Sequence, residues 1–261
     1  MERRTGGTPP KTRTLAINAW GLPGVGKSTF ALTMPPPIYL LNCDRAVDSL
    51  LALLPPTHEI FYESFLLRPG EQLTQQSAQR FLAAFEGLEA LAIQQGEGSF
   101  IIDGGARFWD VIKLAKLPPS AAEGKDLKAW ELPNDYWRSH LLGLENSPLQ
   151  LCITHPAVTI WEGMTKESER LRPDAFKHQG YSLTVDVYIF TTGRPSDLYP
   201  KMVENMALTG QVPGETAHWG IIWRNKFNTK IEQRAVMNLT FPLLYQMTFG
   251  EPWTGSECWT P

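Results

Sequence analysis

Cysteine is scarce in this chain, and the few cysteines are far apart. There are three in 261 residues, Cys43, Cys152 and Cys258. They are too few for a disulfide framework, and their spacing does not match a zinc site. Cys43 and Cys152 lie inside apolar runs, which is typical of buried free thiols in a reducing compartment. We therefore expect a cytoplasmic protein.

Long hydrophobic runs are also missing. No stretch approaches the ~20 apolar residues that a membrane-spanning helix requires, so no membrane contact is expected. The basic start, residues 1–13, lacks the apolar core of a signal peptide and is interpreted as a flexible arm. With 43% hydrophobic and 20% charged residues, the composition is that of an ordinary soluble domain. Because the net charge is −3, any contact with nucleic acid must come from a local patch.

The chain does contain a glycine-rich motif near its amino end. The stretch from Gly21 to Thr29 fits the pattern G-x-x-x-x-G-K-[ST], in which glycines let the backbone turn and aim N–H groups at phosphate oxygens. Lys27 can reach the β- and γ-phosphates of ATP, and Ser28 can bind Mg²⁺. An apolar run before the motif and a helical pattern after it favour this interpretation over an ordinary glycine turn. The expected nucleotide-binding residues are Gly21, Leu22, Pro23, Gly24, Val25, Gly26, Lys27, Ser28 and Thr29.

Apolar runs and helical patterns alternate along the chain. Strands are expected at 14–20, 37–43, 61–65, 99–103, 149–154, 184–190 and 220–223, and helices at 28–34, 46–54, 74–95, 106–117 and 134–144. The polar segments 118–133 and 157–179 are expected to be long loops. This order predicts an α/β fold with a mainly parallel central sheet flanked by helices, extended by the late strands in antiparallel orientation. We expect three parts: the arm at 1–13, a core at 14–240 and a tryptophan-rich C-terminal tail at 241–261.

A triphosphate site also needs carboxylates at the ends of neighbouring strands. Asp103 ends an apolar run and is the candidate Mg²⁺ ligand beside Ser28, unless it only caps the following turn. Glycine, not glutamate, follows it, so the group that orients the attacking water must come from elsewhere. Asp44 would lie beside the phosphate loop if its strand neighbours the first, and otherwise caps the next helix. His155 can contact the γ-phosphate or be a structural histidine.

The two expected loops carry cations interleaved with tryptophan. Cations follow the phosphates of single-stranded nucleic acid, and aromatic rings stack on its bases. Acidic residues in the same loops weaken the field, so solvated loops remain the alternative. The candidate DNA-binding residues are Lys125, Lys128, Trp130, Trp161, Lys166, Arg170, Arg172 and Lys177.

Two further cations, Arg224 and Lys226, lie two residues apart near the end of an expected strand. Alternation along a strand points them to the same side. If they reached the γ-phosphate of an adjacent subunit, they would stabilise the transition state. Otherwise they are ordinary surface cations.

Taken together, these motifs resemble the RecA-like recombination ATPases, especially short phage-encoded members linked to single-strand annealing and recombination. Besides the phosphate loop, the similar segments are Tyr39-Leu-Leu-Asn-Cys-Asp-Arg-Ala-Val-Asp48, Phe100-Ile-Ile-Asp103, Leu151-Cys-Ile-Thr-His155 and Arg224-Asn-Lys226. The resemblance implies a RecA-like P-loop fold and Mg²⁺-dependent hydrolysis of ATP, stimulated by single-stranded DNA. It implies DNA-binding loops at 118–133 and 156–180, and catalytic roles for Lys27, Asp44, His155, Arg224 and Lys226.

The same resemblance implies a homo-oligomeric ring or filament, a single-strand-binding protein as a further partner, and the cytoplasm of a bacterium or phage-infected host. Two residues depart from the family pattern. The catalytic acid is usually glutamate, and Asp44 is one methylene shorter; the phosphate sensor is usually glutamine, and here it is His155. A kinase acting on a nucleotide or another small molecule, and a nucleotide-switched assembly subunit, are the alternative functions.

Overall fold

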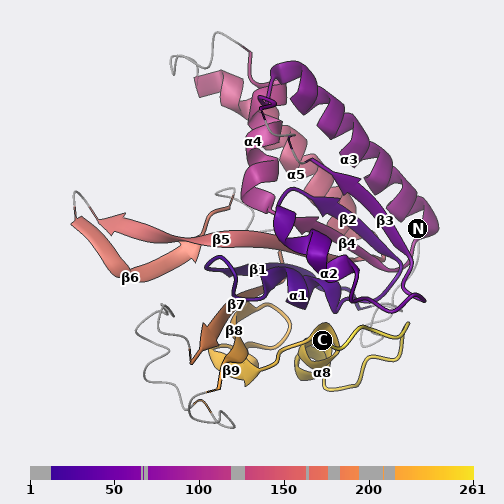
Figure 1. Ribbon diagram of the computed structural model, residues 1–261, viewed down its shortest axis with the longest axis vertical. Helices are drawn as coiled ribbons and strands as arrows, with labels where there is room; N and C mark the ends of the chain where they lie inside the picture. The colour runs from indigo at the N-terminus through magenta and orange to yellow at the C-terminus, as the bar shows by residue number, and fades with distance from the viewer. Residues whose placement is uncertain are drawn as a thin grey trace, which may run out of the picture.

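The computed structural model describes residues 13–65, 67, 70–118, 127–162, 165–175, 183–193, 208 and 215–261, with the backbone alone at 127–128, 159–162 and 165–170. Its strands and helices alternate through the first half of the chain (Figure 1). In chain order the elements are β1 (Ala16–Gly21), α1 (Lys27–Leu32), β2 (Ile38–Asn42), η1 (Arg45–Val47), α2 (Asp48–Leu51), β3 (Ile60–Ser64), α3 (Gln75–Gln95), β4 (Ser99–Asp103), α4 (Gly105–Lys116), η3 (Leu127–Trp130), α5 (Glu131–Asn146), β5 (Gln150–Glu162), β6 (Thr165–Pro173), β7 (Val185–Thr192), β8 (Ala217–Asn225), η4 (Thr229–Ile231), β9 (Arg234–Met237) and α8 (Phe241–Phe249).

The strands form one sheet in the order β3-β2-β4-β5-β1-β7-β8-β9. All pairs from β3 to β7 are parallel, and β8 and β9 then add in antiparallel orientation. The predicted fold class, a RecA-like α/β fold with a mainly parallel sheet and antiparallel strands on its C-terminal side, is confirmed. One detail was wrong: β7 is parallel to β1, not antiparallel. It is buried along nearly its whole length, as parallel strands covered on both faces are.

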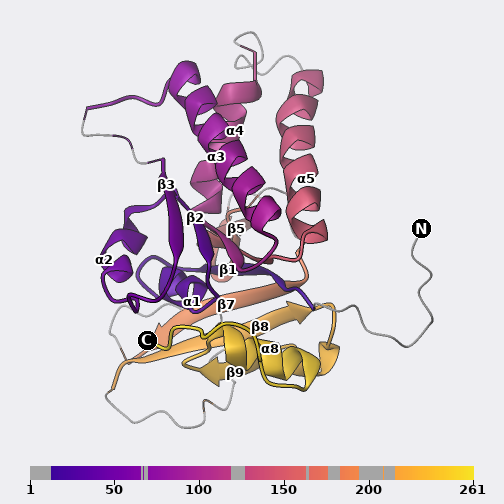
Figure 2. The same ribbon diagram turned by 90° about the vertical axis from the view of Figure 1, so that its right-hand side faces the viewer.

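Helices cover both faces of the sheet. Figure 2 shows α3, α4 and α5 together on one side and α8 on the other. Successive residues of a strand point to opposite faces, and β2 illustrates this: Leu41 packs in the cluster under α3, α4 and α5, whereas Leu40 packs in the cluster with α1 and α8. The two cores hold the ends of the parallel strands in a fixed arrangement.

The long helix α3 begins and ends where the sequence predicts. Thr74 caps its amino end by accepting a hydrogen bond from the Ser77 backbone N–H at 3.2 Å. Gly96 ends it in the left-handed conformation, with φ of 71°, which glycine adopts without steric cost. Phe81, Leu82 and Phe85 are buried against the sheet.

The expected loops at 118–133 and 157–179 were wrong in part. Within the first, η3 and the start of α5 occupy residues 127–133. Within the second, β5 continues to Glu162 and pairs with β6 as an antiparallel ribbon. Figure 1 shows this ribbon projecting beyond the rest of the sheet. A ribbon rich in polar residues lacks the apolar alternation by which strands are recognised in a sequence.

Residues 241–261, expected as a tryptophan-rich tail, begin with α8. Phe241 and Leu244 are fully buried in the same cluster as α1, so this helix is part of the core. Within the described residues, no helix combines the length and apolarity needed to cross a membrane.

Candidate functional site

The glycine-rich loop leaves β1 and enters α1 through a tight turn. Gly24 and Gly26 have φ of 76° and 97°, which strongly favours glycine. A Cβ on Gly21 would lie 2.2 Å from the backbone oxygen of Ile189 on β7, so this position has no room for a side chain. The glycines of the motif therefore serve the turn and the close approach of β7.

Lys27 bends back over this loop. Its Nζ donates to the backbone oxygens of Gly21 at 3.1 Å and Leu22 at 2.8 Å. Burial lowers the pKa of Lys27, while the charges of Asp103 and Asp44 oppose that shift. An ammonium group that donates to these two carbonyl oxygens is well placed to exchange them for phosphate oxygens.

Ser28 and Asp103 meet below the loop. Ser28 Oγ lies 2.9 Å from Oδ1 and 3.0 Å from Oδ2 of Asp103, and Thr154 Oγ1 donates to Oδ1 at 2.7 Å. Burial raises the pKa of Asp103, and the hydrogen bonds from Thr154 and Ser28 partly offset this. The predicted pair of Mg²⁺-binding residues is thus brought together by the fold.

The Ser28 hydroxyl and the Asp103 carboxylate are suitable ligands for Mg²⁺ that is also bound by phosphate and water. Across the part of the chain that the structure describes, no three His, Cys, Asp or Glu side chains gather into a metal cage. Mg²⁺ is commonly held by one or two protein groups, with substrate phosphates and water completing its shell. A hydroxyl and a carboxylate next to a phosphate-binding loop match that preference.

Asp44 lies at the end of β2, but β2 does not neighbour β1. The strands β4 and β5 lie between them, so the condition under which Asp44 was expected to flank the loop is not met. Asp44 is exposed beside the turn after β4, where a Cβ on Gly104 would lie 3.4 Å from its own Cβ. Its charge still acts on Asp103 and Lys27, so it belongs to the same electrostatic site.

His155 is buried where β5 passes the start of α4. Its Nδ1 lies 3.0 Å from the backbone oxygen of Asp174; because a carbonyl only accepts, we assign the proton to Nδ1. Burial lowers the pKa of His155 to about 4. A Cβ on Gly105 would lie 2.4 Å from the ring, which places His155 close to the end of the Asp103 strand. In a neutral ring protonated at Nδ1, Nε2 is the acceptor nitrogen.

Arg224 and Lys226 lie away from the glycine-rich loop of the same chain. Arg224 Nη2 forms an ion pair with Asp186 Oδ2 at 2.7 Å, near the start of β7, whereas the loop follows the end of the parallel neighbour β1. The Lys226 backbone N–H donates to Thr184 at 3.0 Å. Burial raises the pKa of Asp186, and Asn18 and Arg224 oppose that shift.

The candidate DNA-binding residues are spread over two regions. Trp161, Lys166, Arg170 and Arg172 belong to the β5–β6 ribbon, and Arg172 is exposed. Lys128 and Trp130 lie in η3, where the Trp130 side chain is 37% exposed. Lys125 and Lys177 lie outside the described residues.

Sequence reasoning missed a cavity of about 470 Å³ beside the phosphate loop. Its lining includes Gly26 and Thr29 from the loop and the start of α1, and His218 and Asn238 from β8 and just after β9. His218 Nδ1 lies 3.2 Å from the backbone oxygen of Val25, so β8 contacts the loop directly. His218 and Asn238 are more than 180 positions from the loop and follow no local pattern. Thr29, the second hydroxyl of the motif, was the local signal on the cavity side.

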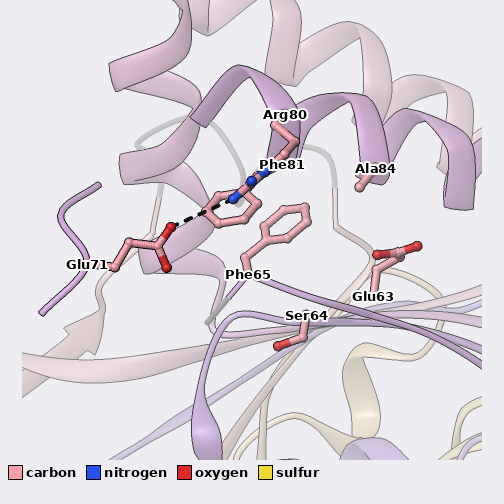
Figure 3. Close-up of a pocket in the computed structure, with 7 residues that line it drawn as sticks. All are labelled: Glu63, Ser64, Phe65, Glu71, Arg80, Phe81 and Ala84. Carbon is pink, nitrogen blue, oxygen red and sulfur yellow. Dashed lines mark ion pairs between the residues drawn. The ribbon is translucent and has the colours of Figure 1, made fainter. Parts of the chain in front are cut away.

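A second cavity of about 580 Å³ lies between the end of β3 and α3 (Figure 3). The rings of Phe65 and Phe81 stack 4.8 Å apart beside it, and Arg80 faces Glu71 at 3.8 Å. None of the predicted site residues lines it, so it is separate from the phosphate loop.

Comparison with known proteins gives distant likenesses only. No family model matches the chain, and no curated protein matches it. Among similar solved structures is the assembled ATPase EscN of the type III secretion system of enteropathogenic E. coli, with a TM-score of 0.43 and 15% identity, covering 78% of this chain and 47% of that one. EscN in complex with its central stalk EscO gives 0.42 and 14%, with 67% and 42% covered.

A third similar structure is a prototypical type III secretion ATPase of pathogenic bacteria, with a TM-score of 0.40 and 14% identity, covering 75% of this chain and 60% of that one. The chain therefore spans about half the length of these proteins. No residue role is taken from them. The strand order and the phosphate loop themselves give this chain a RecA-like P-loop fold.

Proposed function

We propose that this chain binds ATP with Mg²⁺ and hydrolyses the γ-phosphate. The observation that carries the proposal is the meeting of Ser28 with Asp103 at 2.9 and 3.0 Å, directly below a loop that holds Lys27 over its crest. A glycine turn without this function needs neither the buried carboxylate nor the lysine.

Each residue has a distinct task in this proposal. Ser28 and Asp103 would hold Mg²⁺, which when bound neutralises charge on the β- and γ-phosphates. Lys27 would leave the oxygens of Gly21 and Leu22 and contact the same phosphates. Thr154 donates to Asp103 at 2.7 Å and so fixes the orientation of the carboxylate.

Asp44 is proposed to orient the attacking water, as the exposed carboxylate next to the turn after Asp103. His155 is proposed to act on the γ-phosphate or the attacking water from the other side of the turn after Asp103. Because its Nδ1 donates to Asp174, the neutral ring would accept a hydrogen bond from water, and it would contact a phosphate oxygen only if protonated.

The nucleoside end of ATP is proposed to enter the cavity between α1 and β8. Ser28 faces Asp103, whereas Thr29, the next residue, lines the cavity. A chain of phosphates gripped at Lys27 and Ser28 therefore continues past Thr29 toward that space. Its volume of about 470 Å³ falls within the range of roughly 300–1,000 Å³ that is usual for small-molecule sites.

Single-stranded DNA is proposed as the effector, in recombination, annealing or repair. The supporting observation is the β5–β6 ribbon, which bears Trp161, Lys166, Arg170 and Arg172 and continues the strand of Thr154 and His155. Stacking contributes about 1–3 kcal/mol per base, so a tryptophan on a projecting ribbon offers a useful contact. Lys125, Lys128, Trp130 and Lys177 are proposed as further contacts.

A nucleotide-switched assembly subunit is the second candidate, and the position of Arg224 favours it. Arg224 and Lys226 lie away from the loop of their own chain, toward the edge where β7 begins, so a neighbouring copy in a ring or filament is the one whose γ-phosphate they could reach. Arg224 would then break its ion pair with Asp186 and contact the γ-phosphate of the neighbouring copy instead.

The test is phosphate release from MgATP with and without single-stranded DNA at low salt, followed by size measurement under both conditions. The DNA proposal predicts faster release with DNA, weakened by Arg170→Ala and Arg172→Ala together and not by the exposed control Lys230→Ala. If DNA does not change the rate of phosphate release, but nucleotide changes the size of the oligomer, the assembly subunit is supported. Phosphate found on an added nucleotide or sugar instead of in solution supports a kinase.

A further inference from the structure

The nucleoside cavity has a wall that belongs to neither the phosphate loop nor the sheet. Thr260 and Pro261 line it together with Thr29 and His218. They are the end of residues 251–261, a segment that follows α8 and that we call the C-terminal strap. The strap runs back from α8 to reach the side of α1 that faces the cavity.

Several contacts hold the strap in place. Ser256 Oγ donates to the backbone oxygen of Pro36 at 2.7 Å, and Trp253 Nε1 donates to the backbone oxygen of Ser256 at 2.9 Å. The Trp253 ring packs edge-on against Phe241 at 5.2 Å and Tyr245 at 5.0 Å. A Cβ on Gly255 would lie 2.2 Å from the Trp253 ring. The strap is therefore folded onto α8 through its tryptophan.

The strap is also connected to the helix that begins with Lys27. Pro36, its anchor, lies four positions after the end of α1 at Leu32. Thr33 Oγ1 accepts from the Phe241 backbone N–H at 2.8 Å, which joins the end of α1 to the start of α8. The phosphate-loop helix, α8 and the strap thus form one packed unit around the cavity.

We infer that the C-terminal strap is part of the nucleoside-binding site, and that it holds Thr260 and Pro261 against the base and ribose of the bound nucleotide. This rests on the proposed binding of ATP. The packing of the strap against α8 and the binding of the nucleoside are then thermodynamically coupled. Each stabilises the other by the same free energy. The triphosphate part of the ligand lies at the other end of the site and does not contact the strap.

Binding of two different ligands distinguishes the nucleoside end of the site from the phosphate end. MgATP occupies the whole site, whereas magnesium tripolyphosphate occupies the phosphate loop alone. The variants are Gly255→Ala, which displaces Trp253, and Ser256→Ala, which removes the bond to Pro36. Thr254→Ala is the matched control, since Thr254 is exposed and does not line the cavity. Tripolyphosphate binding also reports whether each variant keeps a folded loop.

The inference predicts that both strap variants weaken MgATP binding by calorimetry. A loss of about 1.4 kcal/mol corresponds to a tenfold increase in Kd, and we expect roughly fivefold to tenfold, with tripolyphosphate affinity and Thr254→Ala unchanged. Hydrogen exchange of residues 251–261 should slow on adding MgATP and not on adding tripolyphosphate.

Three results would overturn the inference: unchanged MgATP affinity in both variants, equal losses for the two ligands, or tighter MgATP binding, which would mean that the strap competes for the cavity. If neither ligand binds the unaltered chain, the proposed function fails and this inference fails with it.

Discussion

Ser28 Oγ lies within 3.0 Å of both carboxylate oxygens of Asp103, although the two residues are 75 positions apart. Ser28 lies in the first turn of α1, after β1, and Asp103 ends β4; β5 lies between these two strands. The fold therefore places a buried carboxylate against the Ser28 hydroxyl, directly after the glycine-rich loop. Burying an ionised carboxylate costs stability, and the hydrogen bonds from Ser28 and Thr154 offset only part of that cost.

The first prediction concerns Lys27. A hydrogen bond to a charged group contributes about 1.5–3 kcal/mol, so Lys27→Ala should weaken MgATP binding at least tenfold and lower turnover as well. Calorimetry and phosphate release measure the two effects. The exposed Lys230→Ala should change neither. Normal affinity in Lys27→Ala would remove the lysine from the site.

The second prediction concerns Asp103. Because burial raises its pKa, the ionised carboxylate carries a desolvation cost that an amide lacks. Asp103→Asn should therefore have a thermal midpoint equal to or above that of the unaltered chain without nucleotide, yet lose the Mg²⁺ dependence of ATP binding. Unfolding scans and titrations with and without Mg²⁺ measure this. A variant that keeps its full Mg²⁺ dependence would contradict the assignment.

The third prediction separates binding from turnover at Asp44. Asp44→Asn should leave MgATP affinity within about twofold and lower turnover by roughly 10²-fold or more, as expected for a group that acts on the attacking water. Asp135→Asn, an exposed carboxylate on α5, is the control. Unchanged turnover would exclude Asp44 from the mechanism.

The fourth prediction concerns pH. Burial holds the pKa of His155 at about 4, against an ordinary value of 6.5 for histidine. Between these values the unfolded chain binds more protons than the folded one, so stability rises with pH. The contribution of neutral His155 to the free energy of unfolding is complete above pH 6.5. It is lost as the pH falls to about 4, and the total change is roughly 3 kcal/mol.

His155→Gln should flatten this part of the stability–pH curve, and NMR should show a neutral His155 ring down to about pH 4. A ring that titrates near 6.5 would show that His155 is not buried in the folded protein.

The fifth prediction tests Arg224 in its two settings. Removing its guanidinium takes the ion-pair partner from the mostly buried Asp186, on which the charge of Lys226 still acts. Because Arg224 itself is partly exposed, Arg224→Ala should cost about 1 kcal/mol of stability in the isolated chain. Adding Asp186→Asn should recover that stability. If Arg224 also acts on a neighbour's nucleotide, the double variant should remain slow in the assembled state. Full recovery of turnover would limit Arg224 to its ion pair.

Local patterns predicted most of the fold and the centre of the site. The phosphate loop and Asp103 are each marked by a few adjacent residues, and the α3 boundaries follow from Thr74 and Gly96. These features depend on interactions within a few positions, which a sequence shows directly.

The features that the sequence did not predict depend on distant contacts. The direction of β7 is decided by its pairing with β1, and the β5–β6 ribbon lacks an apolar face. The cavity beside the glycine-rich loop needs His218 and Thr260 to meet Thr29, and the ion pair of Arg224 needs Asp186 from another strand. In each of these contacts the two partners are far apart in the sequence, so no local pattern includes both.

The central claim is that the loop from Gly21 to Thr29, with Asp103, binds magnesium-loaded ATP. Its most direct test is calorimetric titration of the unaltered chain with ATP, in the presence and absence of Mg²⁺. The account predicts saturable uptake of one nucleotide per chain that is strongest with Mg²⁺ and is lost in Lys27→Ala. A titration without binding heat, or binding that Lys27→Ala leaves intact, would contradict it.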